Sequence, residues 1–167
     1  MSVAAHRTAA PHAVRCFVLT VSDTRTLATE TSGAAIAALL EEAGHRVTDR
    51  QVVRDEPAEV ARLLRGAIDR GHADAIITTG GTGVSARDST YEAAVELFDK
   101  HLTGFGELFR MLSFAEVGPA AMLSRATAGI AGRVAIFLLP GSEAAVRLAM
   151  TRLILPELGH VVGELRK

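Results

Sequence analysis

Residues 75–83 have the sequence Ala-Ile-Ile-Thr-Thr-Gly-Gly-Thr-Gly, in which an apolar run passes directly into a glycine-rich run. The first five residues are rich in β-branched side chains, which is typical of a buried strand. The glycines at 80–83 allow backbone N–H groups to turn toward an anion with no side chain in the way, and the Thr82 hydroxyl adds a donor. We therefore predict a phosphate-binding loop at the end of a strand; the alternative is a tight turn into a helix that binds no ligand.

Further strands are predicted on both sides of this stretch, at residues 16–21, 46–53 and 133–139. Apolar residues at helical spacing lie between all of these strands. Such alternation is typical of parallel strands joined by helices. The sequence thus predicts a three-layer α/β fold, with a mostly parallel sheet covered by helices on both faces.

The helices are predicted from apolar stripes and from residues that begin or end helices. The stripes fall at residues 36–43, 60–68, 105–114 and 146–154, and a capping box of Ser89 and Glu92 predicts one more helix after Ser89. Residues 122–128 are expected to add one or two helical turns, and Pro156 to begin a separate final helix.

Composition limits the classes of function. The 167 residues suit one domain, predicted at 15–167 after a flexible extension at 1–14, and the net charge of −1 gives no sign of a nucleic-acid partner. Cys16 is the single cysteine, so a disulfide within the chain and a cysteine-rich zinc site are excluded. With no signal peptide evident and no apolar stretch near the ~20 residues that span a bilayer, we expect a cytoplasmic protein without a membrane partner.

Unusual residues follow each of the four predicted strands. If the sheet is parallel, these loops meet at one edge, where open α/β sheets bind their ligands. Besides the glycine loop, the residues concerned are Ser22-Asp23, Arg54-Asp55-Glu56 and Pro140-Gly141-Ser142. The last triplet leads into a helix whose N-terminus attracts phosphate, although Ser142 could serve only as the helix cap.

Acidic residues beside a predicted anion site need a reason to be there. Asp55 and Asp88 would repel a phosphate unless a divalent cation such as Mg²⁺ bridged carboxylate and phosphate oxygens. The alternatives are that Asp55 caps a helix and that Asp88 pairs with Arg87. The loop lacks the lysine of a P-loop, and residues 81–86 match the dinucleotide pattern only loosely, which keeps a nicotinamide enzyme as a minor alternative.

Taken in order, these motifs resemble the MoaB/MogA family of molybdenum cofactor biosynthesis proteins, and more closely its MoaB branch. The resemblance runs from about residue 17 to about residue 155. It rests on the strand-end motifs above, on Arg87-Asp88 after the glycine loop, and on the segments Gly104-Phe105-Gly106-Glu107 with Arg110, Leu123-Ser124-Arg125 and Leu139-Pro140-Gly141-Ser142. At Ser89-Thr90-Tyr91 the chain departs from MogA-like members, which tend to have Thr-Pro here.

The resemblance implies a molybdopterin-binding fold and an adenylyl transfer, in which the phosphate of molybdopterin attacks ATP and pyrophosphate leaves. Asp55 and Asp88 would be catalytic, with Asp55 holding the Mg²⁺ that accompanies ATP and Asp88 fixing the pterin or its phosphate. The residues implied in substrate or phosphate binding are Ser22, Asp23, Thr79, Gly80, Gly81, Thr82, Gly83, Arg87, Glu107, Arg110, Ser124, Arg125, Pro140, Gly141 and Ser142.

The family also implies partners. Its members are usually trimers and sometimes hexamers, to which the helix with Phe105, Leu108 and Phe109 could contribute an interface, and a molybdenum-insertion protein would take the product. As an alternative to substrate binding, Glu107 and Arg110 are three residues apart on a predicted helix and could form a local surface pair. A carrier that binds molybdopterin without catalysis is the alternative to the transferase.

Overall fold

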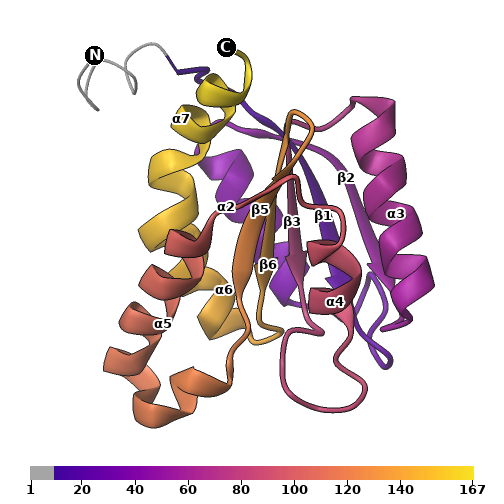
Figure 1. Ribbon diagram of the computed structural model, residues 1–167, viewed down its shortest axis with the longest axis vertical. Helices are drawn as coiled ribbons and strands as arrows, with labels where there is room; N and C mark the ends of the chain where they lie inside the picture. Colours follow the sequence, from indigo (N-terminus) through magenta and orange to yellow (C-terminus); the bar gives the residue numbers. More distant parts are fainter. Residues whose placement is uncertain (1–9) are drawn as a thin grey trace.

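A computed structural model describes residues 10–167 as a sheet between two layers of helices (Figure 1). The strands are β1 (Arg15–Val21), β2 (Arg46–Val53), β3 (Ala75–Thr79), β4 (Lys100–His101), β5 (Thr127–Ala131) and β6 (Val134–Leu139). The α-helices are α2 (Ser32–Glu42), α3 (Pro57–Arg70), α4 (Thr90–Val95), α5 (Thr103–Val117), α6 (Glu143–Ala149) and α7 (Leu155–Leu165). A 3-10 helix at Gly118–Leu123 and a π-helical segment at Met150–Ile154 complete the elements.

The sheet has the strand order β2-β1-β3-β6-β5-β4. Strands β2, β1, β3 and β6 pair in parallel, whereas β5 and β4 run antiparallel at one side. After β1 the chain adds β2 on one side and then returns to add β3 on the other, so the strand order reverses between β1 and β3. In sheets of this type the crevice at such a reversal binds ligands. The predicted three-layer, mostly parallel α/β fold is confirmed.

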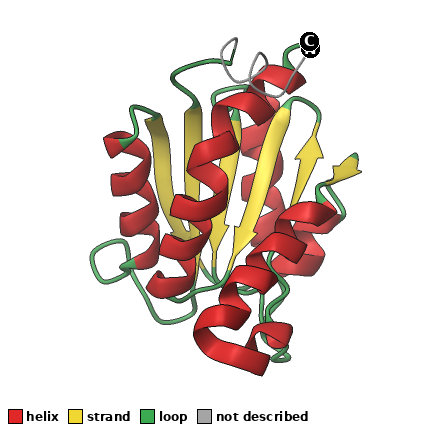
Figure 2. Cartoon of the chain, turned by 90° about the vertical axis from the view of Figure 1, so that its left-hand side faces the viewer, coloured by secondary structure: helices red, strands yellow, loops and turns green. Residues whose placement is uncertain are grey.

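Two apolar clusters fill the space between the sheet and the helices. Val18, Ile77 and Phe137 face α2, α5, α6 and α7, while neighbouring residues such as Leu19 and Ile76 face α3 and α4. Figure 1 shows these two helix layers on opposite sides of the sheet, and Figure 2 shows one layer in front of the strands. Each fully buried Leu or Ile contributes roughly 1.5–3 kcal/mol, so this alternation along the strands fixes which face each helix covers.

Cys16 belongs to the same core. It is fully buried, and burial raises the pKa of its thiol to about 12, so the side chain stays protonated and unreactive.

Several predicted element boundaries are confirmed. Helix α3 has Pro57 in its first turn and ends at Gly71, which adopts a left-handed conformation with φ of 63°. Helix α6 is capped by Ser142, whose side chain accepts a hydrogen bond from the N–H of Ala145.

The capping box at Ser89 is wrong. Ser89 precedes α4 but makes no side-chain cap; its hydroxyl donates to Asp55 instead. Asp55 does not cap α3 either, because the cap position is Glu56, whose side chain makes no capping bond.

The antiparallel part of the sheet was not predicted. Residues 122–128 were expected to be helical, but the 3-10 helix ends at Leu123 and β5 begins at Thr127. The sequence of β5, Thr-Ala-Gly-Ile-Ala, has weak strand preference, and its pairing with β6 decides its structure. Gly129 is required there because an added Cβ would lie 2.2 Å from the ring of Phe98.

The break predicted at Pro156 is also wrong. Helix α6 continues through the π-helical segment into α7, with Pro156 in the first turn of α7. The wider π turn carries the chain past a residue that has no N–H donor.

The predicted extension at residues 1–14 falls mostly on residues 1–9, which lie outside the described part. Val14, however, is fully buried; its N–H donates to His45 and its carbonyl accepts from Arg46. Among residues 10–167, no helix combines the length and apolarity needed to cross a bilayer.

Candidate functional site

The carboxyl ends of β1, β2, β3 and β6 meet at one edge of the sheet, toward which the arrowheads of the parallel strands point in Figure 2. Hydrogen bonds link the loops that follow them. The N–H of Ser22 donates to Val53 (2.8 Å), that of Gly80 to Leu139 (3.0 Å), and the Thr79 hydroxyl to Pro140 (2.8 Å). The predicted convergence of the strand-end loops is therefore present.

A cleft of about 360 Å³ opens at this edge, beside the reversal point between β1 and β3. Its lining residues are Thr20, Val21, Ser22, Thr24, Arg25, Glu30, Thr31, Ser32, Thr79, Gly141, Ser142 and Glu143. Ser22, Thr79, Gly141 and Ser142 were predicted as site residues. The segment from Thr24 to Ser32 was not, because it showed only a polar loop.

Glu30 is the most notable residue that sequence reasoning missed. It is 5% exposed, accepts a hydrogen bond from the N–H of Gly33 (2.6 Å), and pairs with Arg50 at 2.8 Å. Arg50 also donates to the carbonyl of Leu27 (2.9 Å), which ties the loop to β2. The one signal in the sequence was an acidic residue three positions before a helical glycine. The contacts of Glu30 fix this side of the cleft.

Asp55 is buried, with 6% of its surface exposed. Its Oδ1 accepts from the N–H of Ser89 (3.2 Å) and from the Ser89 hydroxyl (2.6 Å). Within residues 10–167, no Lys, Arg or His forms an ion pair with it. A Cβ added to Gly81 would lie 2.6 Å from Asp55 Oδ2, so the glycine allows the loop to approach this carboxylate. Asp55 is thus a buried acid without a cation from the described chain.

Asp88 lies at the end of the glycine loop, next to Ser89. Its Oδ2 accepts from the N–H of Ser85 (2.9 Å), and an added Cβ on Gly83 would lie 2.7 Å from the same oxygen. The suggested pair between Asp88 and Arg87 is wrong, because Arg87 turns to other acids. Because Asp55 binds Ser89, the two predicted catalytic acids share one rim.

Arg87 joins the loops after β1, β2 and β3. It donates to Asp23 at 3.0 Å and to Glu56 at 3.1 Å. Its hydrogen bond, followed by that from the N–H of Asp55, lowers the pKa of Asp23 below its ordinary value. Asp23 and Arg87 were each predicted to bind substrate, and here they bind each other.

The glycine loop packs closely against its neighbours. Thr82 is 2% exposed, and its carbonyl accepts from the N–H of Arg125 (3.1 Å). Gly80 has φ of 99°, and a Cβ there would lie 2.1 Å from the Val21 carbonyl oxygen. Glycine is required at position 80 because the end of β3 packs closely on the end of β1.

Arg110 on α5 contacts the segment before β5 that contains Ser124 and Arg125. Arg110 donates to the carbonyls of Ser124 (3.3 Å) and Ala126 (2.9 Å), so the suggested surface pair with Glu107 is wrong. Glu107 is exposed on α5. Arg125 donates to the carbonyls of Gly83 and Asp88 and pairs with Glu92.

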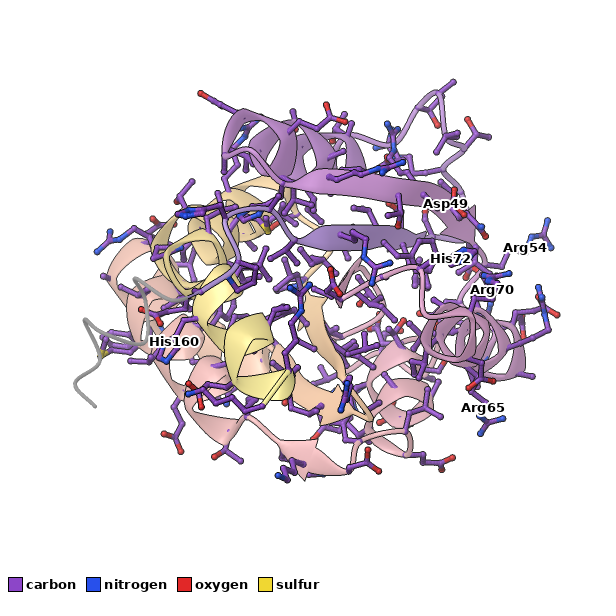
Figure 3. The ribbon with its side chains drawn as sticks, turned by 90° about the horizontal axis from the view of Figure 1, so that it is seen from above. Asp49, Arg54, Arg65, Arg70, His72 and His160 are labelled. Atoms are coloured by element: carbon purple, nitrogen blue, oxygen red, sulfur yellow. The ribbon has the colours of Figure 1, made fainter. Side chains whose placement is uncertain are left out.

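A second cleft, of about 290 Å³, lies at the opposite, amino-terminal edge. Its lining includes Asp49, Arg70 and His72, which Figure 3 shows together beside α3. Asp49 already accepts from the side chain of Gln51. This cleft contains neither the glycine loop nor any strand-end motif.

No group of three or more His, Cys, Asp or Glu residues in positions 10–167 is arranged to hold a metal by itself. Mg²⁺ fits the carboxyl edge in a different way, because it is commonly bound by one or two carboxylates together with the phosphates of a nucleotide. Asp55 supplies a carboxylate of this kind. The nicotinamide alternative lacks support, since β4, the next strand along the chain, ends at His101 and is followed directly by Leu102 and Thr103 and not by an acidic residue.

Comparison with known proteins identifies the family. Residues 17–160 match the model described as "Probable molybdopterin binding domain". The chain belongs to this family. It is 55% identical to molybdenum cofactor biosynthesis protein B of Halalkalibacterium halodurans over 168 residues, covering 100% of this chain and 99% of that protein. It is 52% identical to the protein of the same name from Bacillus subtilis over 169 residues, covering 100% of this chain and 99% of that protein.

Solved structures of this molybdopterin-binding family have the same fold. A crystal structure of a molybdenum cofactor biosynthesis protein B matches with a TM-score of 0.91 and 49% identity, covering 94% of this chain and 98% of that one. The tungsten cofactor synthesizing protein MoaB from Pyrococcus furiosus matches with a TM-score of 0.85 and 39% identity, covering 95% and 100%. The predicted membership of the MoaB/MogA family is confirmed.

Proposed function

We propose that this protein takes part in molybdenum cofactor biosynthesis by adenylylating molybdopterin. A phosphate oxygen of molybdopterin attacks the α-phosphorus of ATP and forms a P–O bond. The bond between the α-phosphorus and the bridging oxygen breaks, and pyrophosphate leaves. Such a reaction depends on positioning and charge neutralisation more than on covalent catalysis, which suits a site built of loops, hydroxyls and carboxylates.

The observation that carries this proposal is the buried carboxylate of Asp55, which has no ion-pair partner among residues 10–167. Burying a charge is costly unless a counter-charge is present. Asp55 would hold an Mg²⁺ that arrives with ATP, and the metal would supply the neutralisation of charge on the leaving pyrophosphate.

The remaining site residues divide by place. Asp88, at the end of the glycine loop, fixes the pterin or its phosphate. The cleft beside β1 and β3 binds a phosphate, to which the N–H groups and hydroxyls around Gly141, Ser142 and Ser22 donate hydrogen bonds. In the free protein Arg87 is engaged by Asp23 and Glu56, and phosphates compete with these acids for it.

The proposal is tested by incubating the purified protein with molybdopterin, ATP and Mg²⁺ and measuring pyrophosphate. Release that requires all three components supports adenylyl transfer. If molybdopterin binds but no pyrophosphate forms, the protein is a carrier and the transferase assignment is wrong.

We further propose that the protein forms a homo-oligomer, a trimer or a hexamer, through the outer face of α5 and the 3-10 helix. The exposed apolar side chains there are Leu108, Met111, Phe114, Val117, Met122 and Leu123. Contiguous apolar surface of this kind marks protein interfaces. Phe109, suggested for this interface, is 1% exposed and belongs to the core.

The oligomer is tested by light scattering after size-exclusion chromatography. Phe114→Asp should reduce the mass to that of a monomer; an unchanged mass would exclude this face. The adenylylated product would pass to a molybdenum-insertion protein in the cytoplasm.

A further inference from the structure

The guanidinium of Arg125 is held almost entirely by the protein. Its Nε donates to the carbonyl of Gly83 (2.8 Å), one terminal nitrogen donates to the carbonyl of Asp88 (3.2 Å), and both terminal nitrogens bind the carboxylate of Glu92. Its Cζ lies 4.9 Å from the centre of the Tyr91 ring. A guanidinium has five N–H donors, and these contacts engage four of them. It therefore has little capacity left to bind a phosphate with paired hydrogen bonds.

The two carbonyls that Arg125 binds lie at the two ends of the loop that carries Asp88. Residues 84–87 between them are exposed. Within the loop, Asp88 accepts from the N–H of Ser85. Arg125 thus joins the two ends of an exposed loop and fixes the position of Asp88.

The backbone around Arg125 is itself fixed. Its N–H donates to the carbonyl of Thr82 (3.1 Å), and Arg110 binds the carbonyls of the residues on either side of it. Gly106 on α5 makes room for this arrangement, since a Cβ there would lie 2.6 Å from the carbonyl oxygen of Ala126. A continuous set of contacts runs from α5 through the start of β5 to the glycine loop.

We infer that Arg125, held by Glu92 and Tyr91, is a positioning residue that orders the Asp88 loop, and that it is not a phosphate ligand. This differs from the substrate-binding role that the family resemblance implies for Arg125. The role of Asp88 in the reaction rests on the proposed function, whereas the ordering of the loop can be measured without it.

Hydrogen exchange tests the ordering directly. In Arg125→Lys the charge is kept, but one ammonium group cannot reach both carbonyls and Glu92 together. We expect the amides of Ser85 and Thr90, which donate within and beside the loop, to exchange at least about tenfold faster, because several charge-assisted hydrogen bonds are lost. The amide of Ile136 in the core should keep its rate, which shows that the fold is intact.

Two further variants make the exchange experiment decisive. Glu92→Gln should raise the same two rates by a smaller factor, about threefold, and it serves if Arg125→Lys fails to fold. Arg62→Lys is the matched control and should change neither rate, because the one acid that Arg62 pairs with in residues 10–167 is Glu59 on α3. Unchanged loop exchange in Arg125→Lys and Glu92→Gln overturns the inference.

Kinetics separate positioning from binding. Arg125→Lys should lower kcat about tenfold or more while KM for ATP and for molybdopterin stays within about twofold. A raised KM with unchanged kcat would make Arg125 a substrate ligand and overturn the inference. If the wild-type protein releases no pyrophosphate, the proposed function fails, and the exchange rates alone decide the role of Arg125.

Discussion

Two buried aspartates, one near the amino ends and one near the carboxyl ends of the parallel strands, differ in whether the described chain gives them a positively charged partner. At the amino-terminal edge, Asp74 is 8% exposed and accepts from the backbone and guanidinium of Arg15 and from Arg166. Although burial alone would raise it, these bonds hold the pKa of Asp74 down to about 2. At the carboxyl edge, Asp55 is 6% exposed, and among residues 10–167 its carboxylate accepts hydrogen bonds only from the amide and hydroxyl of Ser89.

The difference separates a structural acid from the acid that we propose to be functional. Asp74 joins the start of β1 to the C-terminal residues and is neutralised by its own protein. Asp55 has no ion-pair partner among residues 10–167 and lies at the edge where ligands of α/β sheets bind. In the proposed reaction, the Mg²⁺ that accompanies ATP would supply the missing cation.

The largest expected effect concerns turnover. Asp55→Asn and Asp88→Asn should each lower pyrophosphate release by roughly 10²–10³-fold or more, because each removes a charge that acts on the transferred phosphate or its metal. Circular dichroism should show an unchanged fold. Near wild-type rates in either variant would remove that residue from the mechanism.

Gly81 offers the largest expected effect on stability. Gly81→Ala places a Cβ 2.0 Å from the Thr90 hydroxyl and 2.6 Å from Asp55 at a φ of 69°, so overpacking and backbone strain add to about 2–4 kcal/mol. Gly44→Ala is the matched control, with φ of 84° and open space around it, and should cost only about 1 kcal/mol. If the two variants lost equal free energy of unfolding in urea, the glycine loop would not be packed closely against Asp55.

A smaller effect is expected at Asp74. Because its folded pKa, about 2, lies below the ordinary value of ~3.9, its contribution is complete above about pH 4 and is lost as the pH falls toward 2. Asp74→Asn should therefore cost about 1–2 kcal/mol at neutral pH, after allowance for solvent screening. The difference from wild type should shrink between pH 4 and pH 2; a constant difference would contradict the ion-pair account.

The smallest effect belongs to Arg87. Arg87→Gln should leave the melting temperature unchanged, since the ion pairs of Arg87 are exposed. It should nevertheless raise the pKa of Asp23 toward its ordinary value, which carboxyl NMR titration can follow. An unchanged pKa would show that Arg87 does not hold Asp23.

Most of the fold could be predicted from sequence, because the spacing of apolar residues agrees with the positions of the residues that begin and end helices. The apolar run at 75–79 and the stripe of α3 with Pro57 and Gly71 gave the parallel core. Strand β5 could not be predicted, because Ala128 and Gly129 have little strand preference and are held by pairing with β6 and by Phe98.

The site was predictable as a set of strand-end loops, but not in its contacts. Spacing placed Asp55 near the glycine loop because parallel strands end at one edge. It could not show that Ser89 would bind Asp55 instead of capping α4, or that Arg125 would bind two loop carbonyls, because these contacts join residues 34 to 42 positions apart. Glu30 was missed since its pairing with Arg50 crosses from a polar loop to β2.

The unpaired state of Asp55 is tested most directly by the free energy of unfolding of Asp55→Asn and wild type, measured with and without Mg²⁺ and ATP. Without ligand, Asp55→Asn should be at least as stable as wild type, because it removes an uncompensated buried charge and Asn can still accept from Ser89. With Mg²⁺ and ATP at about 100 times the dissociation constant, wild type should gain about 2.7 kcal/mol and the variant clearly less. A variant that is destabilised without ligand and gains as much as wild type with it would contradict the account.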